Sequence, residues 1–146
     1  MPQLTFPVAA AGLAAPVWIG FDGKTSMALI AAGKAVPPPV QGRGLLDTGS
    51  DVTAVAPWVL QWLAVQPVAK TVTQTAAGQV RVNLYEISLG ITDPNQPGGP
   101  WLTIPNLVVT ELVAALTDAD VLVGMDVLLQ CRLVLDGPAR VYSLDF

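Results

Sequence analysis

The sequence predicts a mostly β fold in a single domain over residues 1–146. Short apolar runs recur along the chain, and clusters of Gly, Pro and Asp separate them, which is typical of sheet proteins. Residues 79–87 alternate strongly between apolar and polar side chains, as a strand with one buried face does. Hydrophobic residues make up 52% of the 146 positions, more than one small core needs. We expect the surplus to line a cleft or a subunit interface.

The expected elements follow in chain order. Strands are predicted at residues 3–8, 16–21, 26–31, 44–46, 52–56, 70–75, 79–87, 101–104, 106–109, 121–124, 132–135 and 140–144. Residues 26–31 fit strand or helix by periodicity, and their place between two Gly-Lys turns favours a strand. Short helices are predicted at 58–63, where Pro57 suits the first turn, and at 126–130. Residues 37–39 and 93–100 are predicted to form loops.

Composition restricts the chemistry that this chain can perform. It contains no histidine and one cysteine, Cys131. Ser-His-Asp and Cys-His catalysis and the usual His/Cys zinc sites are therefore excluded within the chain, and we expect no metal and no cofactor. Acid–base chemistry must come from carboxylates. Cys131 is expected to be a small buried hydrophobic residue.

Charge and hydropathy indicate which partners to expect and whether the chain enters a membrane. The formal net charge is -4 and the seven basic residues are scattered, which argues against nucleic-acid binding. The apolar run at 8–20 is short, contains Pro16 and lacks a basic leading region. We therefore expect neither a membrane span nor a signal peptide, and a cytoplasmic protein is the expectation.

The one motif that suggests a catalytic function is Asp47-Thr48-Gly49. Alone it is a weak signal, because the same three residues also occur in ordinary turns. Its context is more specific: Leu45 and Leu46 precede it as a buried type of strand, and Ser50 and an apolar strand follow. Far downstream, residues 121–124 form an apolar run that ends in Gly and precedes a short helix. This combination resembles the aspartic peptidases, and its spacing is similar to their single-domain, retroviral-type branch. Residues 2–6 and 143–146 are similar to the leading and closing strands of those enzymes.

The resemblance implies a closed or partly open β-barrel of the retroviral aspartic protease type, with one or two short helices. It also implies a homodimer in which two Asp47 carboxylates lie across a two-fold axis. Such a pair shares one proton, because both groups cannot ionise cheaply at short range. One carboxylate then activates a water molecule and the other polarises the scissile carbonyl of a peptide or protein substrate.

The resemblance also gives roles to neighbouring residues. Thr48 would hydrogen-bond across the dimer axis, and Gly49 would let the backbone approach the carboxylates closely. Ser50 would donate to the outer oxygen of Asp47. A hairpin with small residues at its tip would close over the substrate as a flap. The expected substrate-binding residues are Ser50, Asp51, Thr75, Ala76, Ala77 and Gly78.

The chain departs from the retroviral pattern in two places. Met125 stands where those enzymes usually have an Arg that pairs with the acid after Asp-Thr-Gly-x, which here is Asp51. Asp51 would then pair with Arg43 or Arg132, or face solvent. Asp126 is expected to be a helix cap or a surface acid. The second departure is a full C-terminal hairpin in place of one closing strand, so the dimer sheet is expected to be built differently.

Other interpretations of the motif remain open at this stage. A catalytically inactive dimerisation or peptide-binding module would keep the fold without turnover. The chain could also be one lobe of a two-lobed pepsin-like enzyme, or a structural sheet protein in which Asp47-Thr48-Gly49 is only a turn. Trp58 and Trp62 are four positions apart on a predicted helix, which favours a packing role over a place in a cleft.

Overall fold

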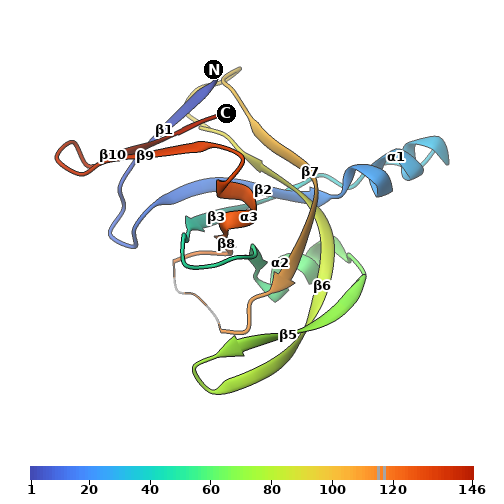
Figure 1. The fold of residues 1–146 in the computed structure, drawn as a ribbon. Helices are drawn as coiled ribbons and strands as arrows, with labels where there is room; N and C mark the ends of the chain where they lie inside the picture. Colours follow the sequence, from blue (N-terminus) through green and yellow to red (C-terminus); the bar gives the residue numbers. More distant parts are fainter. Residues whose placement is uncertain (115, 117) are drawn as a thin grey trace.

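A computed structural model describes residues 1–146 with the exception of 115 and 117, and it shows a barrel with a smaller sheet beside it (Figure 1). The strands are β1 (Gln3–Pro7), β2 (Ala14–Phe21), β3 (Val40–Leu46), β4 (Ala54–Val55), β5 (Ala69–Thr75), β6 (Gly78–Ile91), β7 (Leu102–Glu111), β8 (Val121–Val123), β9 (Arg132–Asp136) and β10 (Val141–Asp145). The helices are α1 (Gly23–Ala31), α2 (Pro57–Leu63) and α3 (Met125–Leu128). The mostly β prediction is confirmed, with one helix more than expected among the described residues.

The larger sheet closes on itself. Its seven strands follow the order β2-β3-β8-β4-β7-β6-β5, and an additional β2–β6 pairing joins the ends of the first six into a closed barrel. Alternate side chains of β2 point inward, so that Ala15, Val17 and Ile19 are buried in the barrel core. β5 lies outside the closed ring, paired only to β6, and its outer edge is free of strand pairing in the described chain.

The smaller sheet has the order β1-β10-β9 and contains both ends of the chain (Figure 1). Leu4 and Phe6 of β1 and Tyr142 and Leu144 of β10 are buried against the main core. The Tyr142 hydroxyl donates a hydrogen bond to the carbonyl of Ala14 on β2, which fixes this sheet to the barrel. The predicted C-terminal hairpin is present as β9 and β10.

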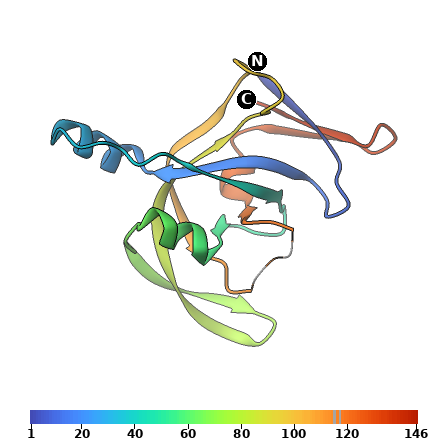
Figure 2. The ribbon, with the colours of Figure 1, turned by 180° about the vertical axis from the view of Figure 1, so that it is seen from behind.

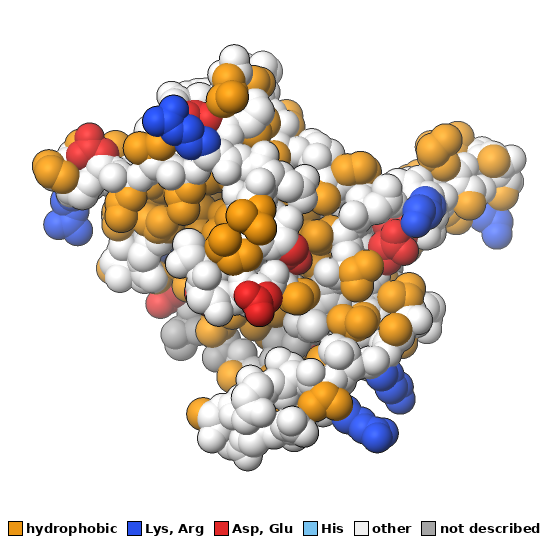
Figure 3. Space-filling model, viewed as in Figure 1, with side chains coloured by type: hydrophobic (Ala, Val, Ile, Leu, Met, Phe, Trp, Pro, Cys, Tyr) orange, Lys and Arg blue, Asp and Glu red, His pale blue; other side chains and the backbone are white. Residues whose placement is uncertain are grey.

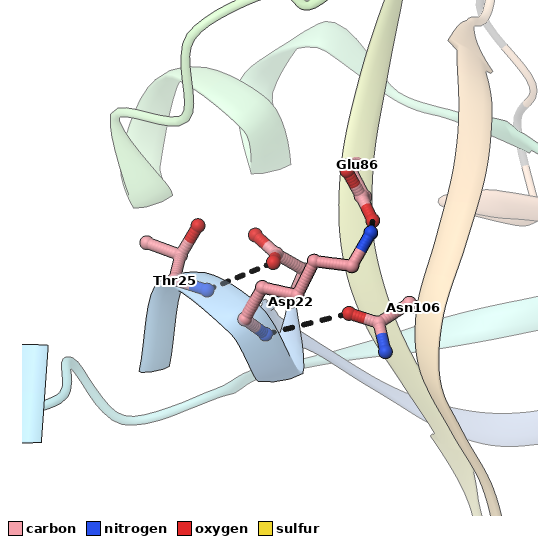
Figure 4. A network of polar contacts seen from close by, with 5 residues as sticks. Asp22, Thr25, Glu86 and Asn106 are labelled. Carbon is pink, nitrogen blue, oxygen red and sulfur yellow. Dashed lines mark hydrogen bonds and ion pairs between the residues drawn. The ribbon is translucent and has the colours of Figure 1, made fainter. Parts of the chain in front are cut away.

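The prediction of a strand at residues 26–31 is wrong, because this segment lies within α1. Asp22 caps the helix by accepting a hydrogen bond from the Thr25 N–H (2.9 Å), as Figure 4 shows. Gly33, at φ +70°, ends it in a Schellman turn, in which the Lys34 N–H donates to the Leu29 carbonyl at 2.9 Å. No residue of α1 is buried, and Figures 1 and 2 show it projecting from the barrel.

Three smaller expectations also need correction. Residues 102–104 and 106–109 belong to one strand, β7, and Trp101 precedes it. The pairing with β6 shifts register between Ile87 and Leu89, and this irregularity accommodates Pro105. Trp58 and Trp62 are 47% and 78% exposed, because α2 buries Val59, Leu60 and Leu63 on its other face. Cys131 is half-buried rather than buried. The three buried side chains of α2, Val59, Leu60 and Leu63, form an i, i+1, i+4 stripe that faces the core.

Candidate active site

Asp47 lies where the central strand β3 ends. β3 pairs in parallel with β8, and the ladder continues one residue further because the Asp47 N–H donates to the Val123 carbonyl (2.9 Å). The strand is packed tightly at this point: a Cβ at Gly44 would lie 2.6 Å from the Val17 side chain. The Asp47 side chain is half-buried. The barrel core therefore fixes the backbone that carries this carboxylate.

The Asp47 loop, residues 47–50, turns back on the carboxylate. The Gly49 N–H donates to Asp47 Oδ1 (2.9 Å), and the Ser50 N–H donates to the Asp47 carbonyl (3.2 Å). A Cβ at Gly49 would lie 3.2 Å from Asp47 Oδ1, a tight contact that explains the glycine. One carboxylate oxygen is thus held in place by a backbone amide of its own loop.

The apolar run that ends in Gly124 lies directly beside this loop. The Met125 N–H donates to the Ser50 carbonyl (2.8 Å), and the Asp126 N–H donates to the Asp51 carbonyl (3.2 Å). A Cβ at Gly124 would lie 2.8 Å from the Ser50 carbonyl oxygen, so only glycine allows this approach. The two motifs that are far apart in the sequence are therefore joined by backbone hydrogen bonds.

A network of side-chain hydrogen bonds also holds the Asp47 loop against the segment that begins at Gly124. Thr53 is fully buried; its hydroxyl donates to Asp126 Oδ1 (2.7 Å) and its N–H donates to Asp126 Oδ2 (2.9 Å). The Thr53 hydroxyl in turn accepts from the Gly124 N–H (3.0 Å), and the Val127 N–H donates to Asp126 Oδ1 (2.9 Å). Asp126 lies in the first turn of α3, whose N-cap position is Gly124, so it is not the helix cap that was expected. It is half-buried, and its carboxylate instead fixes the chain that follows the Asp47 loop.

The structure separates the predicted roles of the loop side chains. The Ser50 hydroxyl donates to the Val52 carbonyl (2.8 Å), so the predicted bond from Ser50 to Asp47 is wrong in this chain. Asp51 is exposed, and the described residues hold one ion pair, Lys24–Glu86, so Asp51 faces solvent. Thr48 is exposed, and its hydroxyl makes no hydrogen bond to any other described residue.

The predicted hairpin is present and stands over a cleft. β5 and β6 pair along their length, and at the turn the Thr75 hydroxyl donates to the Gly78 carbonyl (2.8 Å) and accepts from the Ala77 N–H (3.2 Å). Gly78 has φ +113°, a conformation that suits glycine, and Ala76 and Ala77 at the tip are exposed.

The cleft has a volume of ≈ 680 Å³ and lies between the chain after Asp47, the strand β5 and the connection from β7 to β8. Figures 1 and 2 show these three segments on the same side of the barrel. Its described lining includes Gly49, Ser50, Asp51, Val52, Ala54, Thr71, Val72, Thr73, Gln74, Thr75, Thr110, Glu111, Leu112, Val113, Ala114, Leu116 and Leu122. The predicted residues Gly49, Ser50, Asp51 and Thr75 therefore share one cleft. The other predicted site residues are not part of its lining: Asp47, Thr48, Ala76, Ala77 and Gly78.

The sequence reasoning missed the cleft wall after β7 and the support from Thr53. Leu112, Val113 and Leu116 line the cleft, although nothing in their residue types distinguishes them from core positions. For Thr53 a signal was present: a polar residue stands inside the run Val52–Val55, where a strand with a buried face carries apolar side chains.

The cysteine, the possible metal ligands and the helices each add one observation. Burial, and then the nearby Asp145 charge, raise the pKa of the Cys131 thiol, which keeps it protonated and unreactive. Within the described residues no group of three or more His, Cys, Asp or Glu side chains is arranged to hold a metal ion. In the same part of the chain, no helix is long and apolar enough to cross a membrane.

Comparison with known proteins supports the fold. No protein-family model matches the sequence, and no curated protein matches it. Among solved structures, the crystal structure of a retropepsin-like aspartic protease from Rickettsia conorii is similar, with a TM-score of 0.60. The match covers 97% of this chain and 89% of that chain at 12% sequence identity. The chain therefore has the retropepsin-like aspartic protease fold.

Proposed function

We propose that this protein is an aspartic endopeptidase whose active site forms when two copies of the chain bring their Asp47 residues together. The observation that carries the proposal is the setting of Asp47: it ends a core strand, Gly49 holds one of its oxygens, and a large cleft begins beside it. With no histidine in the chain, a carboxylate is the group that can activate water near neutral or acid pH.

In the proposed mechanism, one Asp47 carboxylate is ionised and its partner is protonated. The ionised group takes a proton from a bound water molecule as the water oxygen attacks the scissile carbonyl carbon. The protonated group donates to the carbonyl oxygen and stabilises the tetrahedral intermediate. The first carboxylate then gives its proton to the leaving nitrogen as the C–N bond breaks. The exposed Thr48 is free to contact its copy across the axis, as the resemblance implies.

The cleft suggests the class of substrate. β5 has a free outer edge beside the cleft, so an extended peptide can pair with it as an additional strand. Val52, Val72 and Val113 line the cleft and are 41%, 52% and 49% exposed. Burying an apolar substrate side chain against such residues contributes about 1.5–3 kcal/mol. We therefore propose that the enzyme prefers apolar residues beside the cleaved bond.

The test compares wild type with Asp47→Asn on a diverse peptide library from acid to neutral pH, with sequencing of the products. We expect wild type to cut next to apolar residues and Asp47→Asn to lose cleavage while remaining folded and dimeric. The asparagine keeps an oxygen that can accept from the Gly49 N–H, but it cannot take a proton from water. Asp93→Asn, the same change in the loop between β6 and β7, is the matched control and should cleave like wild type.

Two results would contradict the proposal. Cleavage by Asp47→Asn at the wild-type rate would remove Asp47 from the chemistry. Peptide binding by wild type without any product would instead favour the catalytically inactive binding module. The Ser50 hydroxyl gives that second candidate a specific basis, because it bonds Val52 and leaves Asp47 without the side-chain donor that the resemblance implies.

A further inference from the structure

The terminal sheet leaves two edges open for a partner. β10 is the central strand, paired to β1 from Gln3↔Asp145 to Pro7↔Val141 and to β9 from Val141↔Asp136 to Asp145↔Arg132. Both of its edges are therefore occupied within one chain, so the C-terminal strand has no free edge for a second copy. The outer edges of β1 and β9 are the ones that remain.

The edge of β1 is poorly suited to pairing. Pro2 stands directly before the strand and Pro7 is its last residue, and proline has no N–H to give to a neighbouring strand. β9 contains no proline between Arg132 and Asp136. An unprotected apolar edge of this kind tends to pair with another strand.

The sequence of β9 is complementary to itself. Its five residues are Arg132, Leu133, Val134, Leu135 and Asp136. If two copies pair antiparallel about Val134, each Arg132 lies opposite Asp136 of the partner subunit. Each Leu133 then lies opposite Leu135 of the partner subunit, and the two Val134 residues meet on the axis. Opposite charges and apolar pairs in these positions both stabilise a sheet.

Burial indicates that this strand lacks a neighbour. Leu133 and Leu135 pair with Leu144 and Tyr142, which are buried, and so they point to the same face of the sheet. Leu135 is nevertheless 57% exposed, and Val134 on the opposite face is 38% exposed. Figure 3 shows hydrophobic side chains gathered beneath the β9–β10 hairpin. A second β9 would extend this apolar face and cover Leu135.

The position of β9 connects it to the candidate active site. It follows α3 almost directly, and the first turn of α3 is bonded to the Asp47 loop through Met125 and Asp126. Figures 1 and 2 show the β9–β10 hairpin projecting on the side of the molecule that carries this loop, whereas α1 projects on the other side. A partner on this edge therefore approaches the Asp47 loop rather than the far side of the barrel.

We propose that two copies of this chain dimerise through the outer edges of β9, which join two three-stranded sheets into one sheet of the order β1-β10-β9-β9-β10-β1. The contact is isologous, as expected for a two-fold dimer. The inference rests on the proposed function, since a chain with one Asp-Thr-Gly needs a second copy to complete its site.

Disulfide trapping tests the register. In a Cys131→Ser background, Val134→Cys should cross-link to a dimer under mild oxidation, because facing residues of an antiparallel pair are about 4.5–5.5 Å apart at Cα. Arg132→Cys is the matched control on the same strand and face. Its two copies would be separated by about 13 Å along the strand, beyond disulfide reach, so it should stay uncross-linked.

Charge reversal tests the same register without cysteine. Arg132→Asp places two acids opposite each other at each end of the pair, and we expect the dimer dissociation constant in sedimentation equilibrium to rise by about tenfold or more. Asp136→Arg alone should weaken the dimer similarly, and the double variant should recover toward wild type. Asp136 also accepts from the Ala139 N–H in the hairpin turn, a bond that Asp136→Arg and the double variant both lose and that Arg132→Asp keeps.

The outcomes separate this inference from the proposed function. A cross-linked Val134→Cys dimer that cleaves no peptide would support the β9 interface and contradict the peptidase. An active dimer with no Val134 cross-link and an unchanged dissociation constant after charge reversal would overturn the β9 interface and leave the peptidase standing. A monomer at every concentration would also overturn the interface.

Discussion

Thr53 offers the sharpest test of how the candidate site is held. The variant Thr53→Val keeps the shape of the side chain but removes the hydroxyl that donates to Asp126 Oδ1 and accepts from the Gly124 N–H. The lost bond to a carboxylate corresponds to about 1.5–3 kcal/mol, and the Gly124 N–H left buried without a partner costs about 1–3 kcal/mol. We expect the free energy of unfolding to fall by about 3 kcal/mol.

Urea denaturation at fixed protein concentration measures this loss, because dimerisation would make the apparent stability depend on concentration. With a slope of about 2 kcal/mol per M for a chain of this size, the midpoint should fall by about 1.5 M. Thr53→Ser is the control: it keeps the hydroxyl and loses one buried methyl group, which costs about 1 kcal/mol. Equal midpoints for the Val and Ser variants would refute the assigned role of the hydroxyl. In the Val background, Asp126→Asn should then add little, because coupled partners are not additive.

Three further changes test other parts of the structure. Gly124→Ala should destabilise the fold by about 1–3 kcal/mol in the same urea assay and reduce cleavage, because its Cβ would lie 2.8 Å from the Ser50 carbonyl oxygen. Asp22→Ala removes the cap of α1, which contributes about 1 kcal/mol to the helix, so the helical signal in far-UV circular dichroism should fall. The urea midpoint should change little, because no residue of α1 is buried and the helix can unfold without the barrel. Burial raises the pKa of Tyr142, so unfolding releases a proton above about pH 10 and stability should fall as pH rises from there. Tyr142→Phe should flatten this alkaline loss in thermal melts, although it also removes the bond to the Ala14 carbonyl.

Much of the fold was predictable because its strands carry strong local signals. The alternation in β6, the small residues at the β5–β6 turn and the turn between β9 and β10 each mark an element by short-range pattern. α1 was mispredicted because Met27, Ala28, Leu29 and Ile30 form an apolar run that suits either state. Asp22 as an N-cap and Gly33 as the terminating glycine were the signals that could have decided for a helix.

The parts that could not be predicted depend on contacts between distant segments. The parallel pairing of β3 with β8, which brings Gly124 beside Ser50, leaves no trace in either segment alone. The exposure of Trp58 and Trp62 depends on which face of α2 the barrel receives, and helical spacing does not give that choice. The Ser50 hydroxyl donates to the Val52 carbonyl because of the loop geometry, and the identity of residue 50 does not predict this acceptor.

The position occupied by Met125 shows how this chain can keep an ordered loop without the ion pair that the resemblance implies. The loop is held by backbone donors at Met125 and Asp126 and by the Asp126 carboxylate, which accepts from Thr53. The backbone bonds do not depend on the side chain at position 125. The Asp126 carboxylate bonds Thr53, which is fully buried, so water and salt screen these hydrogen bonds little. An ion pair at the exposed Asp51 would contribute only about 0–1 kcal/mol. Replacing a surface ion pair by a half-buried, hydrogen-bonded carboxylate therefore loses little rigidity at Asp47 and frees Asp51 to face the cleft.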